Sequence, residues 1–211
     1  MPQTNSGFLA IFSDVASADE TDYLHWLTRE HAQERLSVPG FLAMRVFRAQ
    51  AGQAARFFIF YRLAAPGVVA SESYLARLNA PTPWSQRIMP KLTNFVRGGG
   101  AIVDEMGSGG EGMVAATVLF DATAMEGFRA ASAEIAAADK LAAVRVLQTS
   151  AAGTGIQTSE KSLRKGDRSF SAMLLIEALD EAVLAPVMML ADAASEPPQI
   201  YRQIFALRRD A

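Results

Sequence analysis

Two imidazoles, His25 and His31, are the only histidines in this 211-residue chain, and both lie in the segment 21–41 (TDYLHWLTREHAQERLSVPGF). Histidine titrates near neutrality and is the side chain best suited to act as a general acid or base. On a helix with 100° per residue, His31 shares a face with Tyr23 and Leu27, whereas His25 points the opposite way. We therefore expect His31 to face the protein interior and His25 to face solvent.

Two carboxylates, Glu30 and Glu34, flank His31 in the sequence. A neighbouring carboxylate fixes the tautomer of an imidazole and raises its pKa, which would equip His31 to move a proton to or from a substrate. Arg35 follows one helical turn after His31 and can bind a substrate anion or pair with Glu34. The alternative is that His31 only closes the contact between a helix and a sheet.

A metal centre is not predicted. His25 and His31 point to opposite faces of the helix, so they cannot share an ion, and no carboxylate pair accompanies either of them at ligand spacing. The sequence also contains no cysteine, which excludes disulfides, thiolate catalysis and cysteine-ligated zinc or iron–sulfur sites.

Aromatic residues are concentrated in the first half of the chain, where 13 of the 18 Phe, Tyr and Trp side chains precede Gly112. Because aromatic rings line small-molecule pockets, we place the candidate site in this half. Tyr23 and Trp26 lie on the same helical segment as His31 and are expected to line the cavity. Tyr61, on a predicted strand, is also expected to line the cavity, where its hydroxyl near His31 would suit proton transfer; the alternative is that it only fills the strand.

The next helical segment carries Trp84 and Arg87 between Pro81, Pro83 and Pro90. Prolines on both sides of a short helix predict a kinked lid over the sheet. We expect Trp84 to form a wall of the cavity. Arg87 is expected either to make a salt bridge within the lid or to contact the ligand.

The elements that position these residues follow the same order twice. Strand-like and helical segments alternate as strand–helix–strand–strand–helix–strand, which is the order of the ferredoxin-like βαββαβ unit. The predicted strands are 7–15, 41–49, 56–63 and 101–106 in the first copy, and 113–122, 144–150, 169–179 and 199–208 in the second. We predict an α+β fold with two repeats, 1–107 and 113–211, joined by a glycine-rich linker at 108–112. Because each sheet has one bare apolar face, the two sheets should pack face to face.

Three further patterns carry structural predictions. The run 97–100 (RGGG) follows a predicted helix and is expected to end it, because a phosphate-binding loop would instead precede a helix. The loop 151–167 is longer than a hairpin needs, and its three basic residues are expected to be solvated. Strand alternation places Arg45 on one face with Phe41 and Phe47.

Charge and hydropathy limit the possible partners. The chain has 20 Lys and Arg against 22 Asp and Glu, a net charge of −2, so it lacks the positive field that nucleic acids and anionic membranes attract. The segment at residues 1–7 does not have the pattern of a signal peptide, and no apolar run has the length of a membrane span. We expect a cytoplasmic protein that binds a small molecule, without nucleic-acid or membrane partners, and a homodimer as its possible assembly.

Two motifs resemble a known family. They are Tyr23-x-x-Trp26-x-x-x-Glu30-His31-x-x-x-Arg35-x-x-x-Pro39-Gly40-Phe41 and Pro83-Trp84-x-x-Arg87-Ile88-x-Pro90. Together they resemble the signature of EthD-like proteins in the dimeric α+β barrel superfamily, over residues 7–107. In that superfamily two ferredoxin-like units, normally from two subunits, pack face to face into a barrel. The resemblance implies that duplication places both units in this one chain.

The superfamily includes monooxygenases, isomerases, cyclases and haem proteins, so the resemblance leaves the reaction open. It implies a cofactor-independent enzyme, or an enzyme-like protein, that binds a small apolar or aromatic molecule and uses His31 as general acid or base. One alternative is a non-catalytic ligand-binding or assembly module. Another is a haem protein with His31 as the axial ligand.

Overall fold

The computed structural model describes residues 6–49, 55–151 and 155–209 and forms a closed barrel of eight antiparallel strands. The strand order around the barrel is β1-β3-β2-β8-β5-β7-β6-β4. The strands are β1 (Gly7–Val15), β2 (Phe41–Ala49), β3 (Ala55–Leu63), β4 (Thr93–Gly107), β5 (Val114–Phe120), β6 (Leu141–Thr149), β7 (Ala172–Ala178) and β8 (Gln199–Arg208). Each repeat therefore supplies four neighbouring strands in the ferredoxin-like order.

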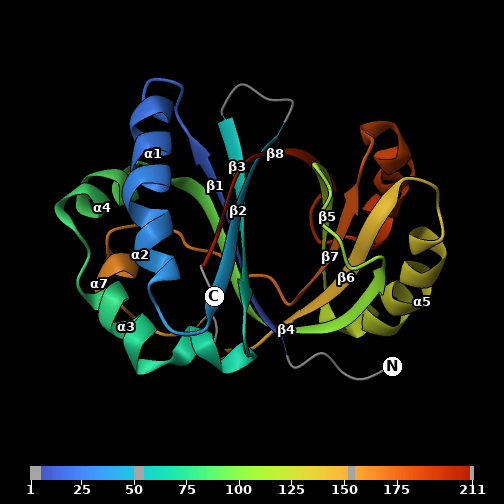
Figure 1. Cartoon of the computed structure of the whole chain (residues 1–211), viewed down its shortest axis with the longest axis horizontal. Coiled ribbons are helices and arrows are strands. Elements are labelled where there is room, and N and C mark those ends of the chain that lie inside the picture. The colour runs from blue at the N-terminus through green and yellow to red at the C-terminus, as the bar shows by residue number, and fades with distance from the viewer. Residues whose placement is uncertain (1–5, 50–54, 152–154, 210–211) are drawn as a thin grey trace.

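The two four-stranded sheets face each other and are hydrogen-bonded along both edges, through β2 with β8 and β4 with β6. This confirms the predicted pair of ferredoxin-like repeats packed as a dimeric α+β barrel within one chain. Figure 1 shows the two sheets side by side, each covered by helices on its outer side. The apolar inner faces of both sheets are thereby removed from water, as the bare faces of the isolated repeats require.

Helices cover the outer faces of the two sheets unequally. The first repeat carries α1 (Glu20–Trp26), a π-helical turn η1 (Leu27–His31), α2 (Ala32–Leu36), the 3₁₀ turn η2 (Pro66–Ala70), α3 (Glu72–Asn79), α4 (Pro83–Ile88) and the 3₁₀ turn η3 (Met89–Lys91). The second carries η4 (Ala122–Ala124), α5 (Met125–Ala136), α7 (Ser159–Ser162) and the 3₁₀ helix η5 (Glu181–Ala193). Among the described residues, no helix has the length and apolar character needed to cross a bilayer.

Strand alternation separates two cores. Phe12 and Phe58 point into the barrel, where their rings stack with centroids 4.7 Å apart. Ile59 and Tyr61 point outward to the layer beneath the helices, as the sequence pattern predicts. Arg45 shares the inner side with Phe47, whereas Phe41 lies on the outer side against Tyr61. The predicted placement of Phe41 is therefore wrong, because a β-bulge between Phe41 and Ala43 shifts the alternation.

The glycine run 97–100 lies inside β4 and does not end a helix, so that prediction is wrong. The helical segment has already ended at Lys91, and β4 continues for 15 residues through the glycines. A Cβ atom on Gly98 would lie 2.4 Å from the Phe170 ring, and one on Gly100 would lie 2.1 Å from the carbonyl oxygen of Gln148. The glycines permit close packing across the barrel rather than a change of direction.

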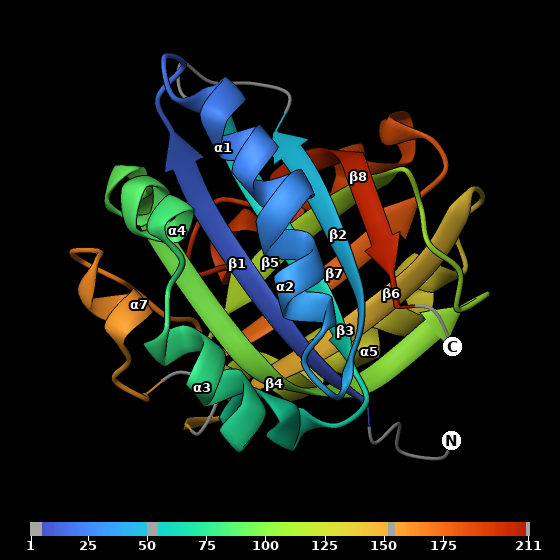
Figure 2. The same ribbon diagram turned by 60° about the vertical axis from the view of Figure 1, so that its left-hand side comes forward.

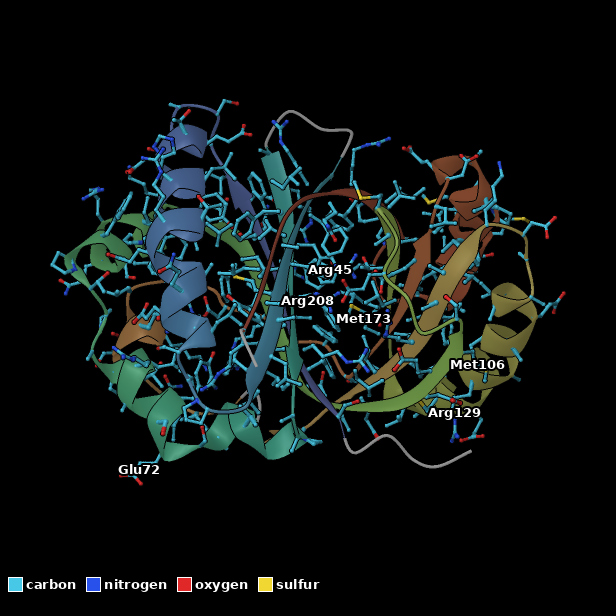
Figure 3. All side chains as sticks on the ribbon, in the orientation of Figure 1. Arg45, Glu72, Met106, Arg129, Met173 and Arg208 are labelled. Carbon is cyan, nitrogen blue, oxygen red and sulfur yellow. The ribbon has the colours of Figure 1, made fainter. Side chains whose placement is uncertain are left out.

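A buried charge cluster joins the repeats at one end of the barrel. The carboxylate of Glu177, which is fully buried on β7, accepts hydrogen bonds from Arg45 on β2 and Arg145 on β6. The same guanidinium groups donate to the carbonyl oxygens of Gly112 (2.7 Å) and Gly110 (3.1 Å) in the connection between β4 and β5. Figure 3 shows Arg45 directed into the space between the two sheets. The inter-repeat connection is thus anchored to the barrel.

Candidate active site

The candidate site is a cavity of about 110 Å³ on the outer side of the first-repeat sheet, beneath the helices. Ile11 and Ile59 form its floor on β1 and β3, and His31 and Arg35 reach it from the helical layer. Exposed Arg168 also lines the cavity, so the cavity reaches the surface. An engineered cavity of about 150 Å³ holds a benzene ring, so this smaller volume, which continues to the surface, suits a ligand with no more than one ring.

His31 is the last residue of the π-helical turn η1, and it is only 3% exposed. A π-turn accommodates one extra residue in a helix and occurs frequently at functional sites. The Nε2 atom of His31 lies 3.1 Å from the Tyr61 hydroxyl on β3, and its ring packs 4.3 Å from the ring of Trp26. Within the described part of the chain, Nδ1 has no hydrogen-bond partner. His31 therefore faces the sheet, and exposed His25 faces solvent, as expected.

The electrostatic environment of His31 differs from the sequence expectation. Burial lowers the pKa of His31 well below its usual value, and the guanidinium groups of Arg35 and Arg164 lower it further. The flanking carboxylates, Glu30 and Glu34, do not offset this fall in the pKa of His31. Glu30 accepts a hydrogen bond from the Thr82 hydroxyl at 2.6 Å, away from the imidazole. The predicted rise in the pKa of His31 is thus replaced by a fall, and the imidazole is neutral near neutral pH.

Glu34 lies next to Arg35 rather than next to the imidazole. Its Oε2 atom is 3.8 Å from Nη1 of Arg35, beyond hydrogen-bond distance. Burial raises the pKa of Glu34, and the guanidinium of Arg35 opposes that rise. Tyr61 is therefore the residue that hydrogen-bonds to the imidazole, where the sequence suggested Glu30 or Glu34, and it is not among the residues that line the cavity.

Arg35 is 2% exposed and forms a buried ion pair with Glu160. Burial is the largest single influence on the pKa of Arg35 and lowers it, but the nearby Glu160, Tyr74, Glu34 and Tyr61 together raise that pKa by more, so it is raised overall. Its guanidinium lies 5.7 Å from the centre of the Tyr74 ring. This pairing fixes Arg35 at the cavity wall one turn beyond His31.

The partner Glu160 comes from the second repeat, on α7. Figure 2 shows α7 beside α3 and α4, among helices of the first repeat. The segment continues to Arg164, whose side chain is 4% exposed, stacks 3.9 Å from the centre of the Phe95 ring and pairs with Asp167 at 2.9 Å. The expectation that the basic residues of the loop are solvated is therefore wrong for Arg164. The unusual length of the loop 151–167 is the feature of the sequence that could have indicated that this segment packs against the first repeat.

Trp84 and Arg87 lie outside the cavity. Both donate hydrogen bonds to Asp22 of α1, at 3.0 Å from Trp84 and 3.2 Å from Arg87, and the Arg87 side chain is 54% exposed. They join α4 to α1 at the surface, which matches the salt-bridge alternative for Arg87. Tyr23 and Trp26 line the cavity, and the Trp26 indole donates to the Ser85 hydroxyl at 3.1 Å.

Neither haem nor a metal ion fits the residues around the cavity. Nε2 of His31, the natural position for an axial bond, is taken by the Tyr61 hydroxyl. The volume of about 110 Å³ is also well below the roughly 300–1,000 Å³ of clefts that hold drug-sized molecules, and haem is no smaller than those. In the three described stretches, no cluster of three or more His, Cys, Asp or Glu residues is arranged to hold a metal ion.

Comparison with known proteins identifies the fold. No family model matches the sequence, and no curated protein matches it. Among solved structures, an anthrone oxidase-like protein aligns with a TM-score of 0.61 and 11% identity, over 100% of this chain and 95% of that one. A candidate monooxygenase from Fusobacterium nucleatum aligns with a TM-score of 0.58 and 8% identity, over 100% and 97%. A mutant chlorite dismutase from Candidatus Nitrospira defluvii aligns with a TM-score of 0.50 and 10% identity, over 97% of this chain and 93% of that one.

These similarities extend over almost the whole chain, so the protein has the tandem-duplicated dimeric α+β barrel fold. At 8–11% identity they establish the fold and leave the reaction open. The narrower EthD-like resemblance stays a prediction.

Proposed function

We propose that this protein binds a small, mostly apolar organic molecule of about one ring in the cavity beside His31, and that His31 transfers a proton to or from it without a cofactor. The observation that carries the proposal is the buried imidazole on the cavity wall whose Nδ1 atom has no hydrogen-bond partner among the described residues. A buried polar atom without a partner is costly, so it favours a ligand that supplies one.

The proposed roles follow from the contacts of the imidazole. When Nε2 carries the ring proton and donates it to the Tyr61 oxygen, Nδ1 is left as a lone-pair acceptor on a residue that lines the cavity. Nδ1 then takes an acidic proton from the ligand, giving imidazolium and a ligand anion, and returns the proton at another position. Burial raises the pKa of Tyr61 well above its usual value, so Tyr61 stays protonated and orients the imidazole.

The aromatic walls support an aromatic or enolisable ligand. Tyr23, Trp26 and Tyr74 surround the cavity with flat apolar surface, and apolar pockets of this kind hold rings. The names of two structural neighbours, an anthrone oxidase-like protein and a candidate monooxygenase, are compatible with such ligands. Proton abstraction of this type would serve an isomerase, a cyclase or a cofactor-independent oxygenase.

The experiment that tests the proposal is thermal unfolding in the presence of phenols, aromatic acids and lactones, followed by assays for ligand consumption. A ligand present at one hundred times its Kd should raise the Tm of the wild-type protein by roughly 5–10 °C. His31→Ala should remove turnover, with a loss of about 10²–10⁴-fold. His25→Ala, on the exposed face of the same helix, is the matched control and should behave as wild type.

Three results separate the alternatives. Turnover that persists in His31→Ala would overturn the proton-transfer role. Binding without consumption of any ligand would favour the non-catalytic binding module. If no compound stabilises the wild-type protein, the cavity is not a binding site and the assembly module becomes the better explanation.

A further inference from the structure

Arg35, in the wall of the same cavity, has a donor nitrogen that makes no hydrogen bond with any described residue and lies 3.8 Å from Glu34 Oε2. Its Nη1 atom is buried and makes no hydrogen bond within the described ranges, while His31 has a similarly unpaired Nδ1. Both side chains are at most 3% exposed and both line the cavity. One of these atoms carries a permanent positive charge and the other belongs to a neutral imidazole, so the pair suits a ligand with an acidic hydroxyl group.

Glu160 limits what Arg35 can bind. The Nη2 atom of Arg35 donates to Glu160 Oε2, which leaves Nη1 as the terminal nitrogen available to a ligand. Carboxylates and phosphates are usually bound by arginine through two parallel hydrogen bonds, for which both terminal nitrogens are commonly used. A single charged oxygen, as in a phenolate or an enolate, is better matched to one nitrogen.

The two charges that act on His31 favour this oxygen in its anionic form, and Glu34 and Glu160, which lie beside Arg35, oppose it. Arg35 and Arg164 both act on His31 and oppose its protonation in the absence of a ligand. An oxyanion in the cavity would offset the charge of the two arginines and raise the pKa of His31, so that the imidazole takes up a proton. The ligand would therefore be bound as an ion pair between its own oxygen and the newly formed imidazolium, close to Arg35.

Extending the proposed function, on which this inference rests, we infer that the cavity takes a one-ring phenol or enol. Its O–H bond breaks, the proton forms a bond to Nδ1 of His31, and the electron pair stays on the oxygen, which binds Nη1 of Arg35. Glu160 of the second repeat is the positioning residue that holds Nη2. The site of the first repeat is therefore completed by the second.

Two probes of equal shape test this inference. One is para-nitrophenol, whose phenolate has a visible absorption band, and the other is para-nitrotoluene, which has a methyl group in place of the hydroxyl. At a pH where free para-nitrophenol is mostly protonated, the wild-type protein should increase the phenolate band on binding. It should also bind para-nitrophenol about tenfold or more tightly than para-nitrotoluene.

The main variant is Arg35→Met/Glu160→Met, in which both members of the buried ion pair become unbranched apolar side chains. Such replacements usually preserve the fold, whereas removal of one partner strands a buried charge. The double variant should lose the phenolate band and the preference for para-nitrophenol, and it should still bind para-nitrotoluene. A double variant that retains both the band and the preference would overturn the role of Arg35.

The second variant, Glu160→Gln, keeps an oxygen that accepts from Nη2 but removes one negative charge. It should tighten binding of the phenolate by about threefold or more, because the site becomes more positive, and leave para-nitrotoluene unchanged. Exposed Glu126, which pairs with Arg129 on α5, provides the control variant Glu126→Gln, expected to affect neither probe. Equal weakening of both probes by Glu160→Gln would mean that Glu160 acts only in structure.

The two proposals fail separately. If other members of the compound panel bind in a His31-dependent manner but para-nitrophenol produces no phenolate band, the inference about Arg35 and Glu160 is overturned and the proposed function stands. If neither the probes nor the panel bind to the wild-type protein, both are overturned.

Discussion

At the scale of single residues, the chemistry of the site depends on a buried neutral histidine. His31 is held between Tyr61 and Trp26, and no flanking carboxylate raises its pKa. Burial and the two nearby guanidinium groups together disfavour a positive charge on the imidazole in the ligand-free protein. This makes the imidazole an acceptor that is available at neutral pH.

The depressed pKa of His31 predicts a pH-dependent stability. Below about pH 6.5 the unfolded chain takes up a proton at this residue and the folded chain does not, so the free energy of unfolding falls as the pH falls. His31 should contribute at most about 1.4 kcal/mol to the free energy of unfolding for each pH unit, the value that corresponds to the uptake of one proton. Urea titrations between roughly pH 5 and pH 7.5 should show a smaller slope in His31→Gln than in wild type.

The matched control is His25→Gln, in which the His31-dependent slope should remain. Equal slopes for wild type and His31→Gln would show that the imidazole does not resist protonation in the folded state. Glu34, whose pKa is raised by burial, contributes in the opposite direction, so the comparison is made between variants that keep it.

The hydrogen bond between His31 and Tyr61 predicts a second measurable effect. Tyr61→Phe leaves Nε2 of a buried imidazole without its partner, which should lower the free energy of unfolding by about 1–3 kcal/mol. The effect should shrink in a His31→Ala background, since the partner is then already absent. A double-mutant cycle by urea denaturation measures this coupling, and additive effects would contradict it.

At the scale of elements, the long strand β4 connects the two repeats because its glycines permit close packing. A Cβ atom on Gly100 would lie 2.1 Å from a backbone oxygen, and backbone cannot move aside cheaply. The same strand pairs with β1 of the first repeat and with β6 of the second. Space at these glycines is therefore a condition for closing the barrel.

Gly100→Ala should accordingly lower the free energy of unfolding by about 1–3 kcal/mol or more. Gly127 on α5 has open space where a Cβ atom would lie, with no described neighbour within 4 Å, so Gly127→Ala should instead stabilise the protein by roughly 0.5–1 kcal/mol. In chemical denaturation the change in the free energy of unfolding should therefore be negative for Gly100→Ala and positive for Gly127→Ala. A neutral Gly100→Ala would show that β4 and β6 can separate at little cost.

At the scale of the whole molecule, the barrel is closed by strand pairing and by one buried carboxylate. Glu177 lies between Arg45 and Arg145, which belong to different repeats. Glu177→Ala would leave two buried guanidinium groups without this partner and should cost about 3–5 kcal/mol of unfolding free energy. The exposed pair of Glu126 and Arg129 offers the control, since Glu126→Ala should leave the free energy of unfolding unchanged within error.

A homodimer stays a prediction for this protein. In this protein one chain pairs both edges of each sheet. Barrel completion therefore requires no second chain. Light scattering tests the homodimer: twice the mass of a single chain would confirm it, and the mass of a single chain would contradict it.

The order of elements, the duplication and the inward direction of His31 are predictable from local sequence patterns. These follow from periodicity, because apolar spacing of 2 or 3.6 residues decides which face of a strand or helix is buried. Periodicity also placed His25 in solvent, whereas the contact between Tyr61 and His31 does not follow from it.

The environment of the site depends on contacts between distant parts of the chain. The contact of Arg35 with Glu160 joins residues 125 positions apart, and no local pattern encodes such a pairing. The same holds for the fall in the pKa of His31, which depends on burial and on Arg164 from the other repeat. The prediction that the glycines at 98–100 end a helix is wrong for the same reason, since the residues that they pack against belong to distant parts of the chain. Local sequence decides which side of an element is buried, and long-range packing decides what that side meets.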